Sequence, residues 1–591
     1  MGDSLFSRIG DFLQRRRPWY KLPRLLAMPR LVAIRNELRD KNLHDTEEPP
    51  LKEHAGPPLD EASRIYRTVD GTSNDLKFPR MGCAGARFGR NFPLDQTRPD
   101  SGRLLNPNPR TVSRELMTRN VFQPATILNL MAASWIQFMV HDWFVHEPAA
   151  ATDTIEVPLQ PNDPWPAPPM KVLRTRVDPL TVAGSTRPPA YVNKNSHWWD
   201  GSQVYGVDTV SAAKIRTGSD GKIRVEPSGR LQIDPATGLE ITGFTDNGWI
   251  GMSMLHGLFA LEHNAICDRL RHEFPAWSDA MLFGKARLIN AALMAKIHTV
   301  EWTPAILPHP VIEIAMNTNW NGLAGSDLQD VFEFLDNSEI LGGILGSKAD
   351  HHTAPYSLTE EFVAVYRMHA LMPDDYTFRS VKDNKVLSQK NLLEVSGAAG
   401  RTFLDQVSLT DMFYSFGVSH PGAMRLHNYP RHLQHLKRDN GELLDLATID
   451  ILRDRERGVP RYNQFRRLVH KDPVKSFDEL SDNPQWVEEI KRVYNNDLEA
   501  VDLMVGLFAE PLPDGFGFSE TAFRVFVLMA SRRLKSDRFF TDDYTPEMYT
   551  QTGLDWVRNN TMITVLKRHF PGVAPALEGV QNAFKPWKPV V

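Results

Sequence analysis

Apolar residues recur at spacings of three and four along much of this 591-residue chain from about residue 248 onward. The pattern is clearest in residues 248–274, 280–302 and 360–372, whereas few segments alternate as strands do. Such spacing places the apolar side chains on one face of a helix, where they can share a core. We therefore predict a mainly α fold. Because no composition shift after residue 115 resembles a linker, one large helical domain is expected.

The N-terminal part has a different character. Residues 1–60 are predicted to form a basic helical arm broken by prolines, and residues 61–591 the main domain. Residues 41–115 are rich in Pro, Gly, Asn and Asp, which indicates extended chain wrapped around the core. A basic amphipathic segment can lie on a membrane surface. Packing of residues 1–40 on their own domain, with the cations in water, is the favoured alternative.

Composition narrows the class of protein. The formal net charge of −4 gives no sign of a nucleic acid partner. Two cysteines, Cys83 and Cys267, fit a reducing compartment better than a disulfide framework. The sequence shows neither a signal peptide nor an apolar run long enough to cross a membrane. We expect a cytoplasmic monomer, with peripheral contact at a membrane left open.

Three short patterns could carry chemistry. In WIQFMVHDWFVHE (135–147), His141 and Asp142 lie in apolar surroundings, where a histidine is more often a hydrogen-bonded core residue than a ligand. His141 and His146 do not have the i,i+4 spacing of a two-histidine zinc site. Tyr366 and His369 have i,i+3 spacing, which predicts one helix face with Cβ atoms about 5–6 Å apart.

A neutral imidazole such as that of His369 is the usual proximal haem ligand, although a Tyr-x-x-His pair alone mostly reflects core packing. In NSHWWDGSQVYG (195–206), oxygen donors recur at alternate positions. Hydroxyl, carboxylate and carbonyl oxygens are the ligands that Ca²⁺ takes. A polar turn would show the same residues.

In this order, the three patterns resemble the peroxidase–cyclooxygenase superfamily of animal haem peroxidases. The resemblance rests on QFMVHD (137–142), DGSQVYG (200–206), MLHGLFALEHN (254–264) and EFVAVYRMHALMPD (361–374). Within that superfamily the chain most resembles the fatty acid α-dioxygenases, through KLPRLLAM, YRTVDGTSND, FGRNFPLDQ, HTVEWT and SDRFFT. This extends the similarity to nearly the whole chain and implies a haem peroxidase-like α-helical domain.

The resemblance implies roles for matching residues. His141 corresponds to the distal histidine, His369 to the proximal iron ligand and Tyr366 to the radical-forming residue. Gln137, one helical turn before His141, is expected to face the distal pocket. The residues implied for calcium are Asp142, Ser196, Trp198 (main chain), Asp200 and Ser202. Those implied for the fatty acid carboxylate are His298, Thr303 and Arg538, with Arg532 and Arg533 as alternatives to the last.

The implied cofactors are one calcium ion and haem b. Non-covalent haem is expected because Val140 stands where mammalian peroxidases carry an acidic residue esterified to the haem. Asn428 is a candidate hydrogen-bond partner for His369. Peroxidases of this superfamily also have a distal arginine, and the stretch from Pro235 to His256 contains no Arg or Lys.

The function expected from this resemblance is haem-dependent fatty acid α-dioxygenation. A Tyr366 radical, formed with an activating hydroperoxide, would take hydrogen from C2 of a long-chain fatty acid, and O₂ would add there to give a 2-hydroperoxy acid. The alternative is a haem peroxidase that oxidises small donors. A non-enzymatic haem- or lipid-binding protein is a third class, which has no need for both His141 and the Tyr366/His369 pair.

Overall fold

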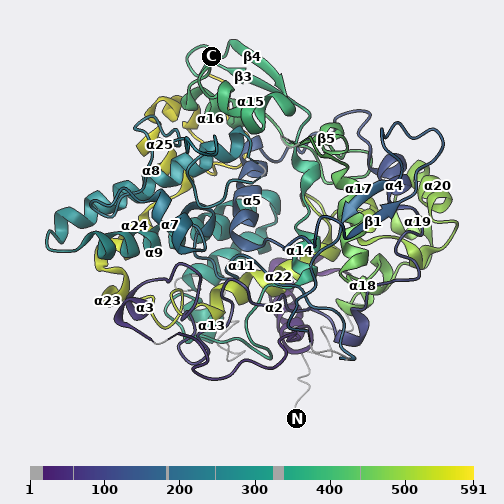
Figure 1. Cartoon of the computed structure of the whole chain (residues 1–591), viewed down its shortest axis with the longest axis horizontal. Coiled ribbons are helices and arrows are strands. Elements are labelled where there is room, and N and C mark those ends of the chain that lie inside the picture. Colours follow the sequence, from purple (N-terminus) through teal and green to yellow (C-terminus); the bar gives the residue numbers. More distant parts are fainter. Residues whose placement is uncertain are drawn as a thin grey trace.

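Three long helices, one near the middle of the view in Figure 1 and two to its left, contribute many residues to the buried core. The computed structural model describes residues 17–57, 59–181, 185–246, 248–323, 338–438 and 441–590. Helices α8 (Ile250–Glu273) and α9 (Asp279–Ile297) pack on each other, and α5 (Leu130–Trp143) packs on α8. Helices α8 and α9 account for two of the three ranges that the apolar periodicity indicated, and the mainly α fold is confirmed.

Polar caps begin the helices that shape the site. The Ser278 hydroxyl accepts the Met281 N–H at the start of α9, at 3.2 Å. At α22 (Glu520–Ser536) the cap is Ser519, and at α14 (Glu360–Val365) it is Thr359. Each cap satisfies an N–H group of the first turn that has no partner inside the helix. The caps therefore fix where these helices begin.

The other described helices of seven or more residues complete the helical part of the fold. They are α2 (Arg24–Lys41), α7 (Thr209–Ile215), α11 (Pro310–Asn321), α15 (Gly397–Phe403), α16 (Leu409–Val418), α17 (Leu446–Glu456), α18 (Tyr462–Leu468), α20 (Pro484–Val493), α21 (Leu503–Ala509), α24 (Gln551–Asn559) and α25 (Met562–His569). Strands form small antiparallel pairs, β1 (Thr154–Val157) with β2 (Met170–Leu173), β3 (Asp375–Arg379) with β4 (Val386–Asn391), and β5 (Leu436–Lys437) with β6 (Leu443–Leu444).

The N-terminal part wraps the helical core, as expected. Helix α2 packs on α22 and α11, and its Leu31 and Leu38 are buried in the main core. The chain that follows is joined to later segments by isolated β-bridges, such as His44 to Arg90 and Gly89 to Thr359. The division at residue 60 stays a prediction, and residues 1–16 of the basic arm lie outside the described residues.

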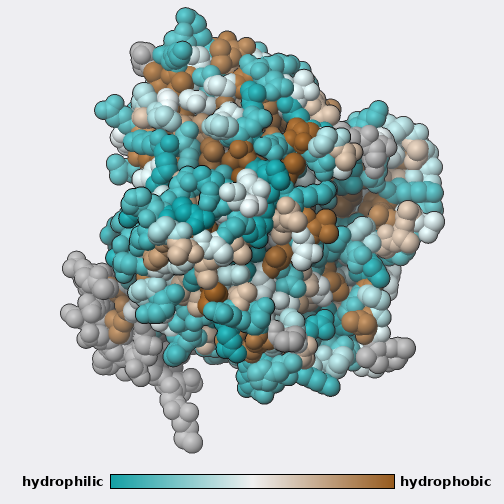
Figure 2. All heavy atoms as spheres, turned by 60° about the vertical axis from the view of Figure 1, so that its left-hand side comes forward, coloured by the Kyte–Doolittle hydropathy of each residue, from teal (hydrophilic) through white to brown (hydrophobic). Residues whose placement is uncertain are grey.

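The surface is mainly hydrophilic on the face shown in Figure 2, where exposed apolar side chains form small separate patches. No helix in the described part of the chain is long and apolar enough to cross a membrane.

The segment with Tyr366 and His369 is not one helix, contrary to the prediction from their spacing. Helix α14 ends at Val365, and a separate 3-10 turn begins at His369. Between them the Met368 N–H bonds to the Tyr366 carbonyl at 2.8 Å, which turns the chain. The two side chains therefore start from different local backbones, and Tyr366 and His369 need not point the same way.

Candidate functional site

A cavity lies between α5, α11, α14 and α22. Aromatic and aliphatic side chains form most of its wall, and Tyr366, His298, Thr303 and Arg533 supply polar groups. The lining residues are Trp143, Trp199, His298, Thr299, Thr303, Met316, Asn319, Phe362, Tyr366, Ala530, Arg533 and Leu534. An apolar cavity with a few converging polar groups is the usual form of a small-molecule site.

Arg533 is the unusual group in this wall. It is only 2% exposed, and its Nε and Nη2 atoms have no hydrogen-bond partner. Its guanidinium lies over the rings of Trp143 and Trp199, with Cζ 4.1 and 4.4 Å from the ring centroids. A buried cation with free donors is costly unless an anion completes it. The cavity is therefore suited to a carboxylate.

His298 stands beside this arginine as a neutral donor. Its Nδ1 lies 3.2 Å from the indole Nε1 of Trp135, which can only donate, so the proton of the ring is on Nε2. Burial and the charge of Arg533 hold the pKa of His298 well below its ordinary value. The ring stacks on Trp302 at 4.6 Å between centroids. His298 can thus offer one N–H to a ligand in the cavity.

Tyr366 is held by aromatic rings. Its ring meets Trp143 edge to face at 5.3 Å and lies 4.4 Å from Phe362, measured between centroids. Tyr366 is 5% exposed, and burial raises the pKa of its phenol, so the hydroxyl stays protonated. The structure thus brings Tyr366, His298 and Arg533 to one cavity.

Arg538, the arginine predicted to bind a carboxylate, does not line this cavity. It pairs with Asp543, and its guanidinium donates to the carbonyls of Ser63, Arg64 and Ser73. Its donors already have partners. Arg533, one of the two alternatives to Arg538, is the arginine in the cavity wall.

Thr303 lies in the cavity wall, as expected, but its hydroxyl donates to the His298 carbonyl at 2.9 Å. That bond closes the π-helical turn His298–Trp302 after α9. The hydroxyl oxygen can still accept a hydrogen bond from a ligand. To donate one, the hydroxyl would have to rotate its hydrogen away from the His298 carbonyl.

His369 lies outside this wall and has a carboxylate partner. Its Nδ1 is 2.7 Å from Asp450 Oδ2, which leaves Nε2 available for a metal ion. Asn428, predicted as the partner, instead accepts from Arg119 Nε at 2.9 Å and from the Gln123 N–H. The side-chain oxygen of Asn428 is already used by these two donors, so it does not accept a hydrogen bond from His369.

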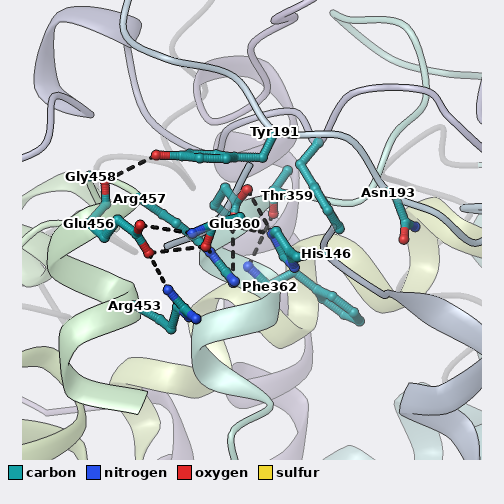
Figure 3. A network of polar contacts seen from close by, with 12 residues as sticks. His146, Tyr191, Asn193, Thr359, Glu360, Phe362, Arg453, Glu456, Arg457 and Gly458 are labelled. Carbon is teal, nitrogen blue, oxygen red and sulfur yellow. Dashed lines mark hydrogen bonds and ion pairs between the residues drawn. The ribbon is translucent and has the colours of Figure 1, made fainter. Parts of the chain in front are cut away.

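A buried polar network joins the segment after α5 to the start of α14 and to the chain just beyond α17 (Figure 3). His146 Nε2 lies 3.0 Å from both carboxylate oxygens of Glu360, the first residue of α14. Arg457, just beyond α17, lies 4.0 Å from the same carboxylate. Burial would raise the pKa of Glu360, but His146 and Arg457 lower it to about 2. The network fixes α14, and so Tyr366, against α17.

His141 and Gln137 lie on α5, where they contact Phe244 and Trp249 respectively. The His141 ring is 4.5 Å from the Phe244 ring, and its Nδ1 has no hydrogen-bond partner. Burial lowers the pKa of His141 to about 3, so the imidazole is neutral at pH 7. Gln137 Oε1 accepts the indole N–H of Trp249 at 2.7 Å, so its carbonyl is already engaged.

The residues predicted to bind calcium gather around two buried carboxylates. Asp142 Oδ1 accepts the Ser202 hydroxyl at 2.8 Å, whereas Asp142 Oδ2 and both oxygens of Asp200 lack hydrogen-bond partners. Burial and the charge of Asp200 raise the pKa of Asp142 to about 7. Arg287 lies 3.4 Å from Asp200. Buried oxygens left without donors fit a cation.

Ser196 and Trp198, the other two members of this predicted set, are completely buried, and the Ser196 hydroxyl accepts the Trp198 N–H at 3.1 Å. No cluster of three or more His, Cys, Asp or Glu side chains suited to a metal occurs among the described residues. The predicted ligands supply only two carboxylates, so hydroxyl and carbonyl oxygens would have to complete the site.

Comparison with known proteins finds relatives that match nearly the whole chain. The family model for animal haem peroxidase matches residues 66–583. The chain is 36% identical to alpha-dioxygenase 1 of Capsicum annuum, over 99% of this chain and 92% of that protein. It is also 36% identical to alpha-dioxygenase PIOX of Oryza sativa, over 99% of this chain and 96% of that protein.

Solved structures of fatty acid alpha-dioxygenases also match the chain over nearly its whole length. The crystal structure of the Arabidopsis thaliana fatty acid alpha-dioxygenase matches with a TM-score of 0.91 and 35% identity, covering 99% of this chain and 93% of that chain. A tyrosine-to-phenylalanine variant of the Oryza sativa enzyme, crystallised with palmitic acid, matches with a TM-score of 0.90 and 35% identity, covering 99% and 97%. The chain therefore belongs to the animal haem peroxidase family and, within it, to the fatty acid alpha-dioxygenases.

Proposed function

We propose that this enzyme adds O₂ to C2 of a long-chain fatty acid, with Tyr366 as the residue that takes the hydrogen. The observation that carries the proposal is Arg533, a buried cation with two free nitrogens in the wall of the cavity that Tyr366 lines. A carboxylate on Arg533 and His298 would fix the acid by its head group. The carbon next to the carboxylate would then lie nearest to the phenol.

The residues around His369 and His141 fit non-covalent haem b. The Asp450 contact leaves His369 Nε2 free to hold the iron, and the neutral His141 has an unpartnered nitrogen. When bound, the haem supplies the oxidising equivalent of the activating hydroperoxide. His141 would accept the hydroperoxide proton and return it to the leaving oxygen as a general acid.

Tyr366 would then lose a hydrogen atom and, as a radical, take one from C2. O₂ adds to the carbon radical, and the resulting peroxyl recovers hydrogen from Tyr366. The product is a 2-hydroperoxy fatty acid, which can lose CO₂ and water, with cleavage of its C1–C2 and O–O bonds, to give an aldehyde one carbon shorter. The packed rings of Trp143 and Phe362 hold the phenol in one orientation through this cycle.

We propose one calcium ion between Asp142 and Asp200, completed by oxygens of Ser196, Trp198 and Ser202. The buried carboxylate oxygens of Asp142 and Asp200 that accept no hydrogen bond support it. Because Asp142 follows His141 directly on α5, the ion would brace the helix that carries the distal base.

Peripheral membrane contact remains a proposal for the N-terminal part. Leu25 and Leu26, at the start of α2, are 61% and 50% exposed, and the exposed cations Lys21 and Arg24 lie beside them in the sequence. Sedimentation with anionic vesicles tests this contact. A Leu25→Ser/Leu26→Ser variant should stay in the supernatant, and Val386→Ser/Leu387→Ser, which changes an exposed pair on β4, is the matched control.

Oxygen-electrode turnover with palmitic acid tests the main proposal. Wild-type enzyme should consume O₂ only when fatty acid is present, and mass spectrometry should locate oxygen at C2. Guaiacol oxidation by hydrogen peroxide without fatty-acid-dependent O₂ uptake would instead support a small-donor peroxidase.

A further inference from the structure

The imidazole of His369 donates a hydrogen bond to the carboxylate of Asp450, which also accepts hydrogen bonds from other side chains. Asp450 Oδ2 accepts His369 Nδ1 at 2.7 Å and the Tyr429 hydroxyl at 2.9 Å. Its other oxygen, Oδ1, accepts Arg367 Nη1 at 2.7 Å. Three donors from two separate segments of the chain, residues 367–369 and Tyr429, therefore converge on one carboxylate of α17.

This cluster is buried and charged. Asp450 is 4% exposed, and the Arg367 side chain is 11% exposed. Arg367 also faces a second carboxylate, that of Asp454, at 3.3 Å. A charge pair this well buried is screened little by water, so a change on one member acts strongly on the others.

We propose that Asp450 is a positioning residue that orients the proximal His369 and sets its strength as an electron donor, and that Arg367 limits that strength. The inference rests on the proposed role of His369 as the iron ligand. A carboxylate that accepts the Nδ1–H fixes the ring and makes its Nε2 more basic. Arg367 draws negative charge toward Oδ1. It therefore reduces the electron density that the carboxylate donates to the imidazole ring through Oδ2.

The proposal predicts shifts of opposite sign. Asp450→Asn keeps the shape and an acceptor oxygen but removes the charge, so the donor strength of His369 should fall. Arg367→Gln removes the opposing cation, so the donor strength should rise. Tyr429→Phe removes one competing donor from Oδ2 and should give a smaller rise. A cluster that only held the backbone together would move all three variants the same way.

The measurement is the iron–histidine stretching frequency of the ferrous holoenzyme by resonance Raman, together with the Fe(III)/Fe(II) reduction potential. Asp450→Asn should lower the frequency and raise the potential. Arg367→Gln should raise the frequency and lower the potential, and Tyr429→Phe should follow it to a smaller extent. Arg453→Gln is the matched control, because Arg453 lies on the same helix but pairs with Glu456.

Shifts of equal sign in Asp450→Asn and Arg367→Gln, or no shift in Asp450→Asn, would overturn the proposal. If Arg367→Gln does not fold, the sign for Tyr429→Phe decides, since that change removes only a hydroxyl. Failure of the proposed ligation would look different. In that case His369→Ala would keep its haem and its iron–histidine band, whereas the proposal requires that band to be lost.

Discussion

Replacing Arg533 with methionine removes the one Arg or Lys side chain among the described residues of the cavity wall while keeping an unbranched apolar stem. Truncating one partner of a buried, hydrogen-bonded charge pair costs about 2–4 kcal/mol, which weakens binding about 30- to 1,000-fold. Palmitic acid should therefore bind Arg533→Met that much more weakly. The fatty-acid-free variant should be at least as stable as the wild type, because an incompletely paired buried cation has been removed.

Thermal unfolding with and without palmitic acid measures both effects. At a palmitic acid concentration 100 times the wild-type Kd, binding stabilises the wild type by about 2.7 kcal/mol. A variant with 100-fold weaker binding would gain only about 0.4 kcal/mol at that concentration. The rise in Tm on adding palmitic acid should therefore nearly vanish.

Arg538→Met is the matched control. Arg538 donates to buried carbonyls of Ser63, Arg64 and Ser73, so its loss leaves acceptors unpaired at about 1–3 kcal/mol each. The Tm of Arg538→Met should fall while its palmitic acid affinity stays unchanged. The reasoning is refuted if Arg533→Met binds palmitic acid normally and Arg538→Met does not.

Three further changes test other parts of the site. Tyr366→Phe should keep the Soret band but lose fatty-acid-dependent O₂ uptake; uptake that survives would exclude the tyrosyl scheme. His298→Phe should raise the KM for palmitic acid about 10- to 100-fold, the effect of losing a hydrogen bond to a charged group, with a small change in kcat; an unchanged KM would remove His298 from carboxylate binding. Chelation with EGTA should lower the Tm because Asp142 and Asp200 would face each other without the ion; recovery with Ca²⁺ but not Mg²⁺ is expected, and a Tm indifferent to EGTA would argue against the site.

Periodicity was enough to predict the long helices, because each buries a continuous apolar face. It failed after Val365, where α14 ends although the apolar pattern continues to residue 372. The i,i+3 spacing of Tyr366 and His369 therefore carried no geometric information. Only the order of motifs along the chain marked these residues.

The three arginines near the end of α22 show a second limit. Arg532 donates to the carbonyls of Ala354 and Pro355, whereas Arg533, one residue further around the helix, faces the cavity. Helix α22 ends at Ser536, so no helical spacing can place Arg538. Which arginine meets the substrate depends on the rotation of α22 against α14, and that is a property of tertiary packing.

Asp450 was missed because nothing local marks it. It lies 81 residues after His369, and an aspartate within a charged helix ordinarily faces solvent. A sequence signal is available in hindsight: Asp450 and Asp454 lie one turn apart on the helix face that also contains the buried Ala447 and Ile451. Paired carboxylates on an apolar face predict buried cationic or histidine partners.

The central claim is that hydrogen is taken from C2 of a fatty acid. Competition between palmitic acid and its 2,2-dideuterated form measures this directly. The proposed chemistry predicts that the enzyme consumes the unlabelled acid faster and that the shortened aldehyde from the labelled acid retains one deuterium. Equal consumption of both acids, with two deuterium atoms retained and oxygen on another carbon, would contradict the claim.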